Sequence, residues 1–434
     1  MGIIRLSSTN PKFGFIIFKN PATGLLVKEN RLGHLFGYYS QDKDGNINEN
    51  EYIVYFRDQH NRVSYQTKRD SSFDYIDVLR YASPRILLDI NKQFFRSTMN
   101  RDQAVVFDQD GVYENCIVSE FTKIDFNLKR LSHFSLYFTD VQFNFRLLKG
   151  NIYQVTLTTK RSLHYLINLS DVLFMYITLL NSDYFVCSED QTESLIKSMN
   201  IVKADYYIRY LIKNKTIYSS VVFDKFKPLL EKDQPIQLCY GNTQTQRLQH
   251  LQRLLSFSRS IVDIGCGEGS YAVPYSRKLK NTDHVYYAMD VDSGPLATLN
   301  QKVKTKCLEN VKTFNSLESL FGEGGYQGEE CDMIITEVVE HMDQEPGQQL
   351  LKEILGKFNW KSVIITTPNQ EFNKYYLGLE GFRHDDHNWE ATRPKFERYM
   401  SIVLDGDLNV KVEYLDIGDR VEGVPITQGC LITK

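Results

Sequence analysis

The sequence has no excess of basic charge, no closely spaced cysteine pair and no long apolar run. Its 51 Lys and Arg residues are balanced by 54 Asp and Glu residues, so the formal net charge is -3. Proteins that hold nucleic acid over a broad surface are usually strongly basic. If the ligand is a nucleic acid, we therefore expect a local patch to bind it.

The seven cysteines stand at positions 116, 187, 239, 266, 307, 331 and 430. None belongs to a CxxC pair and their number is odd, which disfavours a disulfide framework and a zinc ribbon. MGIIRLSSTN does not resemble a signal peptide, and Leu6 replaces the Ser or Thr of a myristoylation start. The longest apolar run, Val172–Leu180, is too short to cross a bilayer. These absences predict a cytoplasmic protein with no membrane partner.

Length and composition allow several ordinary folded domains. The 434 residues suffice for two or three cores, and shares of 42% hydrophobic and 24% charged residues are typical of a globular chain. The residue patterns predict a strand-rich subdomain over 1–140, a small α+β subdomain over 141–235 and an α/β domain over 236–434. The polar segment GNTQTQR at 241–247 supports the last division.

In the first part, β-branched and aromatic runs predict strands at Phe13–Phe18 and Glu51–Phe56. Helical spacing of apolar residues predicts a helix at Pro84–Phe95. The segment 40–51 fits six positions of a calcium-binding EF-hand loop, with Ser40 in place of the usual leading Asp. Because strand-like sequence flanks it instead of two amphipathic helices, we prefer a hairpin turn at DGN.

The second part begins with a strand pattern at Ile152–Leu157, followed by helical patterns at Ser170–Leu180 and Glu189–Met199. The run Tyr206–Lys213 mixes aromatic and basic side chains, which is compatible with a surface that faces RNA. We prefer amphipathic packing, in which the stems of Lys and Arg cover apolar neighbours.

The third part alternates strand and helix signals, the pattern of a parallel sheet with helices on both faces. A helix pattern at Arg247–Phe257 precedes the string SIVDIGCGEG at 260–269. Glycines after a strand let the backbone approach a nucleoside, because no Cβ is in the way. Asp290 closes the next strand, where a carboxylate can accept hydrogen bonds from ribose hydroxyls. We therefore expect a nucleoside-containing cofactor at this edge of the sheet.

Two kinds of cofactor fit a glycine turn followed by an acid. A nicotinamide cofactor is one alternative, since a bare GxGxxG motif is shared by many dehydrogenases. VDIGCGEG more closely resembles the first motif of class I S-adenosylmethionine-dependent methyltransferases. This resemblance implies a Rossmann-like α/β fold for the carboxyl-terminal domain and S-adenosylmethionine as the cofactor.

The heptad TEVVEHM at 336–342 follows the apolar strand pattern of 331–335. Glu337, Glu340 and His341 are spaced at i, i+3 and i+4, which would place them on one face of a helix. Carboxylates beside an imidazole suit a divalent ion such as Mn, Fe or Zn. A solvated surface helix can carry the same residues, so the heptad alone leaves both interpretations open. A metal site here would share a sheet edge with the glycine turn.

Further motifs follow a strand pattern at 362–366, namely TTPNQEFN at 366–373 and RHDDHNWEATR at 383–393. Together with VDIGCGEG and EVVEHM, in this order and spacing, they resemble the HEN family of small-RNA 3'-terminal ribose 2'-O-methyltransferases. Upstream, SSTNPKFGFIIFKNP, YIDVLRYAS and YQVTLTT resemble the amino-terminal half of the bacterial RNA-repair members, an α+β module.

The resemblance implies an enzyme that methylates the 2'-OH at the 3' end of single-stranded or nicked, tRNA-like RNA. Its amino-terminal module would support the ligase step of a partner kinase-phosphatase-ligase in a hetero-oligomer. The implied metal ligands, which also carry the catalysis, are Glu337, Glu340, His341 and His387, and the ion of the family is Mn. The implied cofactor contacts are Asp263, Gly265, Gly267, Asp290, Ser316 and Leu317.

The sequence departs from the family pattern in two motifs. WEATR stands at 389–393 where FEWTR is usual, and Gln370 and Phe372 replace residues of PNREYN. Besides the dehydrogenase, two alternatives remain open: a methyltransferase for a small catechol or a protein, and a non-catalytic RNA-repair scaffold. The large amino-terminal half argues against the first alternative, and the intact set of predicted ligands argues against the second.

Overall fold

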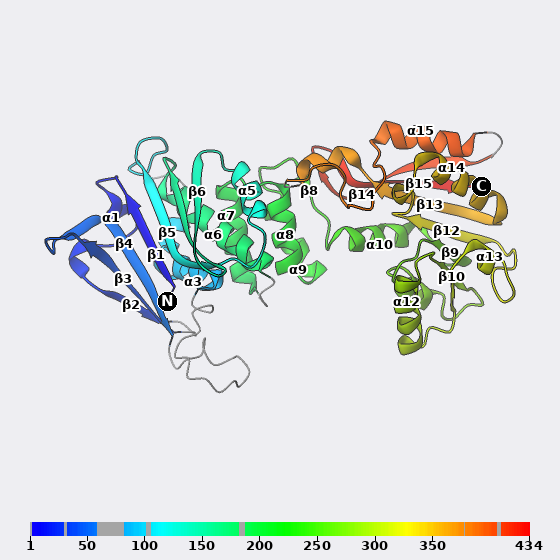
Figure 1. Ribbon diagram of the computed structural model, residues 1–434, viewed down its shortest axis with the longest axis horizontal. Coiled ribbons are helices and arrows are strands. Elements are labelled where there is room, and N and C mark those ends of the chain that lie inside the picture. The colour runs from blue at the N-terminus through cyan, green and yellow to red at the C-terminus, as the bar shows by residue number, and fades with distance from the viewer. Residues whose placement is uncertain are drawn as a thin grey trace. The chain divides into compact units, whose positions relative to one another are not determined.

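The computed structural model describes residues 2–29, 33–58, 82–100, 106–181, 187–376, 378–405 and 409–434. The chain forms two compact units, Met1–Asp233 and Gln234–Lys434. In Figure 1 the first unit runs from blue to green and the second from green to red. The predicted division after residue 235 lies two residues beyond the division in the structure. The motif YIDVLRYAS lies almost wholly outside the described residues.

The first unit combines an antiparallel sheet with a layer of helices (Figure 1). Its elements, with η for a 3-10 helix, are β1 (Ile3–Ser8), α1 (Phe13–Ile16), η1 (Pro21–Thr23), β2 (Leu26–Glu29), β3 (Gly33–Gln41), β4 (Ile47–Asp58), α3 (Pro84–Phe94), α4 (Arg96–Met99), β5 (Asn115–Lys123), α5 (Lys129–Leu136), β6 (Val141–Lys149), β7 (Ile152–Thr159), α6 (Leu163–Leu180), α7 (Glu189–Ile201), α8 (Tyr206–Thr216) and α9 (Ser220–Leu230). Within the described residues the strand order is β2-β3-β4-β1-β5-β7-β6.

This sheet crosses the subdomain division that we predicted after residue 140. Strand β7 pairs with β5 and β6, so residues on both sides of that division share one hydrogen-bonded ladder. Local residue patterns identify the strands but do not reveal which strands pair over a long sequence separation. The amino-terminal half is therefore one α+β unit and not two.

Helix α6 is the centre of the helical layer. It begins at Ser162, whose hydroxyl accepts the N–H of Tyr165, and it contacts α3, α4, β5, β7, α7 and α8. Its 18 residues include the run Val172–Leu180, so the helix is longer than that run suggested. By length and composition alone it could cross a membrane, but 83% of it is buried inside the structure, as in the core helix of a globular domain.

The segment Phe13–Phe18, which we predicted as a strand, instead contains helix α1. Asn10 starts this helix, since its side chain accepts the N–H of Lys12 and its carbonyl accepts the N–H of Phe13. Phe13, Ile16 and Ile17 are then buried at helical spacing. In an apolar run this short, helical and alternating patterns overlap, and the turn at Asn10 decides between them.

Two other interpretations of the first unit are confirmed. Strands β3 and β4 form a hairpin, in which Asp42 accepts the N–H groups of Asp44 and Asn46, and Gly45 has a φ of +83°. Helix α8 packs into the core through Arg209, which is fully buried. The Arg209 guanidinium donates to main-chain carbonyls at the ends of neighbouring helices, so it does not face RNA.

The second unit alternates strands and helices. Its elements are β8 (Ile236–Gln237), α10 (Thr243–Leu254), β9 (Ser260–Ile264), α11 (Ala272–Lys278), β10 (Tyr286–Met289), α12 (Ser293–Lys306), β11 (Val311–Phe314), α13 (Leu317–Leu320), β12 (Cys331–Thr336), η2 (Val339–His341), α14 (Gln344–Lys357), β13 (Trp360–Pro368), η3 (Gln370–Tyr375), α15 (Arg393–Leu404), β14 (Lys411–Val421) and β15 (Val424–Thr433). The strand order in the described part is β11-β10-β9-β12-β13-β15-β14-β8.

Strands β9 to β13 are parallel to one another, whereas β15 lies antiparallel to both β13 and β14. Because side chains alternate along a strand, the sheet supplies a core on each face. Met333 and Ile335 belong to the core covered by α14 and α15. Ile334, between them, belongs to the core covered by α10, α11 and α12. Because helices cover both faces of the sheet, we expect a ligand to bind at the carboxyl ends of the parallel strands.

Candidate metal centre and cofactor site

The glycine turn follows β9 directly at the carboxyl edge. Gly265 and Gly269 have φ values of +75° and +76°, which side chains other than glycine rarely adopt. A Cβ on Gly265 would come within 2.4 Å of the Val338 side chain. The turn is therefore packed directly against the segment that follows β12, and that segment carries the predicted metal ligands.

Asp290 lies at the same edge, immediately after β10. Its Oδ2 accepts the N–H of Gly267 at 2.7 Å and its Oδ1 accepts the N–H of Asp292 at 2.9 Å. The carboxylate therefore closes the glycine turn while it remains partly exposed. This position suits a carboxylate that binds ribose hydroxyls.

Asp263 is placed differently from the other predicted cofactor residues. It lies inside β9, is fully buried and accepts the hydroxyl of Tyr286 at 2.6 Å. Burial raises its pKa to about 7, although the hydrogen bond from Tyr286 opposes this shift. Asp263 thus lies in the strand before the glycine turn, bonded to Tyr286 of the next strand, and has no exposed surface toward a ligand.

Ser316 and Leu317 follow β11, the strand next to β10. The hydroxyl of Ser316 caps the short helix α13, since it accepts the N–H of Ser319 at 3.1 Å. Because β9, β10 and β11 are parallel neighbours, five of the six predicted cofactor residues lie at one edge, and Asp263 is the exception.

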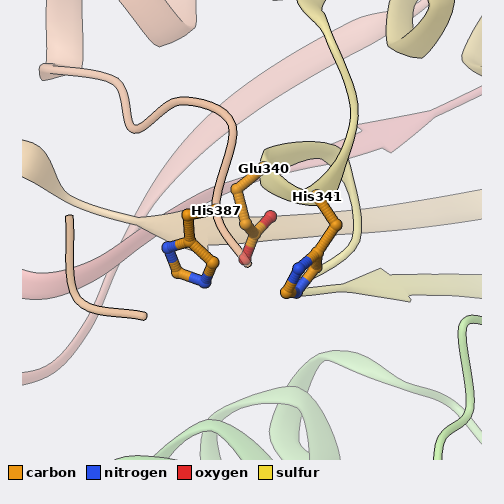
Figure 2. Close-up of side chains that lie close together, drawn as sticks. All are labelled: Glu340, His341 and His387. Atoms are coloured by element: carbon orange, nitrogen blue, oxygen red, sulfur yellow. The ribbon is translucent and has the colours of Figure 1, made fainter. Parts of the chain in front are cut away.

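Three of the four predicted metal ligands come together. Ligand atoms of Glu340, His341 and His387 all lie within 4.8 Å of one another. Figure 2 shows the Glu340 carboxylate between the two imidazole rings. Glu340 and His341 belong to η2, whereas His387 comes from the loop before α15. Two segments that are far apart in the sequence therefore form this cluster.

The hydrogen bonds of Glu340 leave one oxygen for a ligand. Its side chain is fully buried, and Oε2 accepts the hydroxyl of Thr367 at 3.2 Å. Oε1 has no hydrogen-bond partner among the residues that the structure describes. Burial raises the pKa of Glu340, and the nearby Glu337 adds to the shift. A divalent cation bound between this carboxylate and two imidazoles would stabilise the buried charge, so the cluster fits a metal ion.

A second carboxylate fixes the orientation of His387. The Nδ1 atom of His387 lies 2.7 Å from Oε1 of Glu390, and both side chains are buried. Because an ionised carboxylate only accepts hydrogen bonds, Nδ1 carries the proton and Nε2 is left as the ligand atom. Glu390 also accepts the N–H of Arg383 and the amide of Asn373.

The loop that carries His387 is fastened to η2. The N–H of Asn388 donates to the carbonyl of Glu340 at 2.8 Å, and the indole of Trp389 donates to the carbonyl of Val339 at 2.9 Å. Nδ1 of His341 contacts the Asp386 carboxylate at 3.3 Å. These contacts set the distance between the two halves of the cluster.

Glu337 lies apart from the cluster, and the predicted helical face does not form. Glu337 has a φ of +54°, and η2 begins only at Val339. Its carboxylate pairs with Arg247 at 3.0 Å and accepts the hydroxyl of Thr366 at 3.2 Å. The i, i+3, i+4 spacing places residues on one face only of a continuous helix, whereas the chain turns sharply after β12.

Sequence reasoning missed several residues that shape this site. In the sequence, Arg247 is only the start of a predicted helix, and Thr366 and Thr367 are only part of a motif. Glu390 stands in the WEATR string, but nothing in one sequence says that its carboxylate faces His387. Such contacts depend on tertiary packing between segments.

The architecture of the second unit defines a class of protein. A strand order in which antiparallel β15 lies between β13 and β14, with a glycine turn after β9 and an acid after β10, defines a Rossmann-like, class I S-adenosylmethionine-dependent methyltransferase fold. The predicted fold class is confirmed. A chain of the solved Pnkp1/Rnl/Hen1 RNA repair complex matches with a TM-score of 0.81 and 25% identity, over 100% of each chain.

The Hen1 N-terminal domain model matches residues 3–235, more than half of the chain, and the chain therefore belongs to the Hen1 family. The chain is also similar to the small RNA 2'-O-methyltransferase of Arabidopsis thaliana, with 27% identity over 199 residues. The Caenorhabditis elegans protein of the same name is 28% identical over 198 residues. Each match covers 41% of this chain, but 20% of the plant protein and 43% of the nematode protein. The chain thus spans less than half the length of these curated relatives.

Proposed function

We propose that the protein methylates the 2'-OH of the 3'-terminal nucleotide of RNA, with S-adenosylmethionine as methyl donor and a divalent ion, Mn in the first place, at the Glu340, His341 and His387 cluster. The observation that carries this proposal is the position of the cluster. Val338, in the same segment as Glu340 and His341, packs on Gly265 of the cofactor turn, so the cluster lies next to that turn. A cation site and a methyl-donor site at one sheet edge suit transfer to a hydroxyl.

The side chains have separate tasks in this proposal. Asp290 binds the cofactor ribose, and Glu390 keeps Nε2 of His387 directed at the cation. A cation held by Glu340, His341 and His387 would supply charge stabilisation for a ribose hydroxyl that gives up its proton. His384 can accept the proton, since its ring lies 5.1 Å from that of His387 and it is not one of the three clustered ligands. A 3'-phosphate would occupy the place of the second hydroxyl, so a free diol is the expected substrate.

The first unit is proposed to support a partner. The similarity to a chain of the Pnkp1/Rnl/Hen1 RNA repair complex covers the whole chain and thus both units. We infer that the α+β unit Met1–Asp233 binds a polynucleotide kinase-phosphatase-ligase and aids its ligase step. The seven free cysteines agree with a location in the cytoplasm, where thiols stay reduced.

The test is transfer of labelled methyl from S-adenosylmethionine to short single-stranded RNA, with and without Mn. The 3' ends to compare carry a 2',3'-diol, a 2'-deoxy sugar or a 3'-phosphate. We expect labelling of the diol end only, and only with metal. Labelling of the 2'-deoxy end, or transfer that persists in a chelator, would reject the proposal.

The His387→Ala variant links this activity to the cluster. We expect it to lose Mn binding and metal-dependent methyl transfer, while binding of S-adenosylhomocysteine stays within about twofold of wild type. His284→Ala is the matched control, because His284 precedes β10 at the opposite end of the strands. Loss of folding in His387→Ala alone, seen by circular dichroism, would assign His387 to the core instead.

A further inference from the structure

The Glu337 carboxylate is held by two partners within the second unit. Arg247 of α10 approaches Oε2 at 3.0 Å, and the hydroxyl of Thr366 donates to Oε1 at 3.2 Å. The exposed fractions of the Arg247 and Glu337 side chains are 14% and 21%. An ion pair with this little solvent is screened less than a surface pair, so it can hold its geometry.

Strand β13 explains why the two glutamates are held apart. Thr366 and Thr367 are consecutive in the strand, and consecutive side chains point to opposite faces. Thr366 donates to Glu337, whereas Thr367 donates to Glu340. The main chain of Glu337 is fixed as well, since its N–H donates to the carbonyl of Thr366 at 3.0 Å. The Glu337 carboxylate is thereby directed to Arg247 and away from the histidines.

The chemistry of a divalent site nevertheless favours a second carboxylate. One carboxylate and two neutral imidazoles leave a bound dication with a net positive charge. Glu337 stands only three residues before Glu340, and although its carboxylate is outside the cluster it is near enough to raise the pKa of Glu340. A cation in the cluster therefore attracts the same group that Arg247 attracts.

We propose that Arg247 and a divalent cation compete for the Glu337 carboxylate, so that Arg247 sets the affinity of the metal centre. The inference rests on the metal site of the proposed function. Glu340, His341 and His387 bind the cation, and Glu337 becomes the fourth ligand when it leaves Arg247. The released guanidinium keeps a partner, because its Nε already lies 3.4 Å from the hydroxyl of Tyr271 beside the glycine turn.

The first experiment measures Mn affinity of the full chain from the free-ion electron paramagnetic resonance signal. Arg247→Met should bind Mn about tenfold more tightly than wild type, a change of about 1.4 kcal/mol. Arg247→Lys keeps the charge but not the planar fork, so about a threefold gain is expected. Arg253→Met is the matched control on the same helix, because Arg253 is exposed and its removal should leave the affinity unchanged.

The second experiment repeats the Arg247→Met change in a Glu337→Gln background. Without the Glu337 charge there is nothing to compete for, so the Arg247 change should no longer tighten binding. An equal gain in both backgrounds would show a general charge effect and overturn the inference. Weaker binding in Arg247→Met and Arg247→Lys would also overturn it, and would make Arg247 a support for a bound Glu337.

These outcomes are separable from failure of the proposed function. Mn binding that does not depend on His387 would remove the metal centre itself. Mn binding that depends on His387 but is not tightened in Arg247→Met or Arg247→Lys would leave the metal centre standing and reject only the competition.

Discussion

Each unit of this protein buries a carboxylate with at least one oxygen that has no hydrogen-bond donor among the described residues, and the two carboxylates differ in their neighbours. Asp171 of α6 is fully buried, and neither of its oxygens has a hydrogen-bond partner within the described ranges. The nearby Ser198 donates to Asn168 instead. Burial raises the pKa of Asp171 to about 6, and Lys92 opposes this shift.

Glu340 of the second unit is just as buried, but two imidazoles stand beside it. Asp171 can avoid the cost of a buried negative charge by taking up a proton. Glu340 instead lies beside two imidazoles, which could bind the same cation as its carboxylate. An unsatisfied buried carboxylate therefore does not define a site by itself. The neighbouring ligand atoms decide whether it is a binding group or a local weakness.

The sharpest way to break this comparison is to neutralise both carboxylates. Glu340→Gln should lower Mn affinity by more than about 100-fold, because loss of a direct ligand exceeds the range known for outer partners. Asp171→Asn, the matched change in the other unit, should leave Mn affinity unchanged. Calorimetric titration of the full chain with Mn measures both. Equal losses, or no loss in Glu340→Gln, would remove the distinction.

The next largest effect is on stability. Because the folded pKa of Asp171 is about 6 and its ordinary value is 3.8, the folded chain holds this proton more tightly than the unfolded chain. The contribution of Asp171 to the unfolding free energy should thus fall as pH rises from about 4 to 6. Asp171→Asn should be more stable than wild type by up to about 3 kcal/mol at pH 7.5, and by little at pH 4.

Urea unfolding at the two pH values tests this expectation. Asp224→Asn is the control, since Asp224 is exposed on α9 of the same unit. A gain that is equal at both pH values would mean that the charge of Asp171 is not its cause.

A smaller effect is expected from the carboxylate that orients His387. Glu390→Gln can donate through its amide and so no longer fixes the proton on Nδ1 of His387. We expect Mn affinity to fall by about tenfold to 100-fold, the range for partners of metal ligands. Glu371→Gln changes an exposed carboxylate in η3 of the same region and should have no effect. Unchanged Mn affinity in Glu390→Gln would mean that the loop alone fixes the orientation of the His387 imidazole.

The smallest effect is expected for Asp290, whose two carboxylate oxygens both accept main-chain hydrogen bonds. Asp290→Asn should weaken binding of S-adenosylhomocysteine by about tenfold, because one charged acceptor is lost. Mn affinity should stay the same, since Asp290 is not in the metal cluster. Asp283→Asn, an exposed change before the same strand, is the control. Unchanged cofactor affinity would place the ribose elsewhere.

The sequence was most informative where functional residues directly follow predicted parallel strands. Glycines after a strand and an acid after the next strand predicted the cofactor edge, because parallel strands bring their carboxyl ends together. The prediction from sequence was wrong where a short segment has a helical residue spacing but does not form a continuous helix. The i, i+3, i+4 spacing of EVVEH predicted one helical face, but the positive φ of Glu337 separates the first glutamate from the others.

Tertiary pairing could not be foreseen from local patterns either. Phe13–Phe18 alternates like a strand, but a turn at Asn10 makes it helical. The pairing of β7 with β5 joins two parts that the local patterns predict as separate subdomains. Contacts such as Arg247 with Glu337, or Glu390 with His387, join segments whose approach is decided by the whole fold.

The burial of α6 on all sides has a consequence for synthesis of the chain. Its partners α3, α4, β5 and β7 precede it, whereas α7 and α8 follow it. While the ribosome is still adding α7 and α8, one apolar side of α6 has no cover. A nascent chain that stalls in this interval would expose a helix apolar enough for chaperones or a membrane to capture. Synthesis of the chain through the end of α8, at about residue 216, should therefore cover α6 and prevent its binding to chaperones or a membrane.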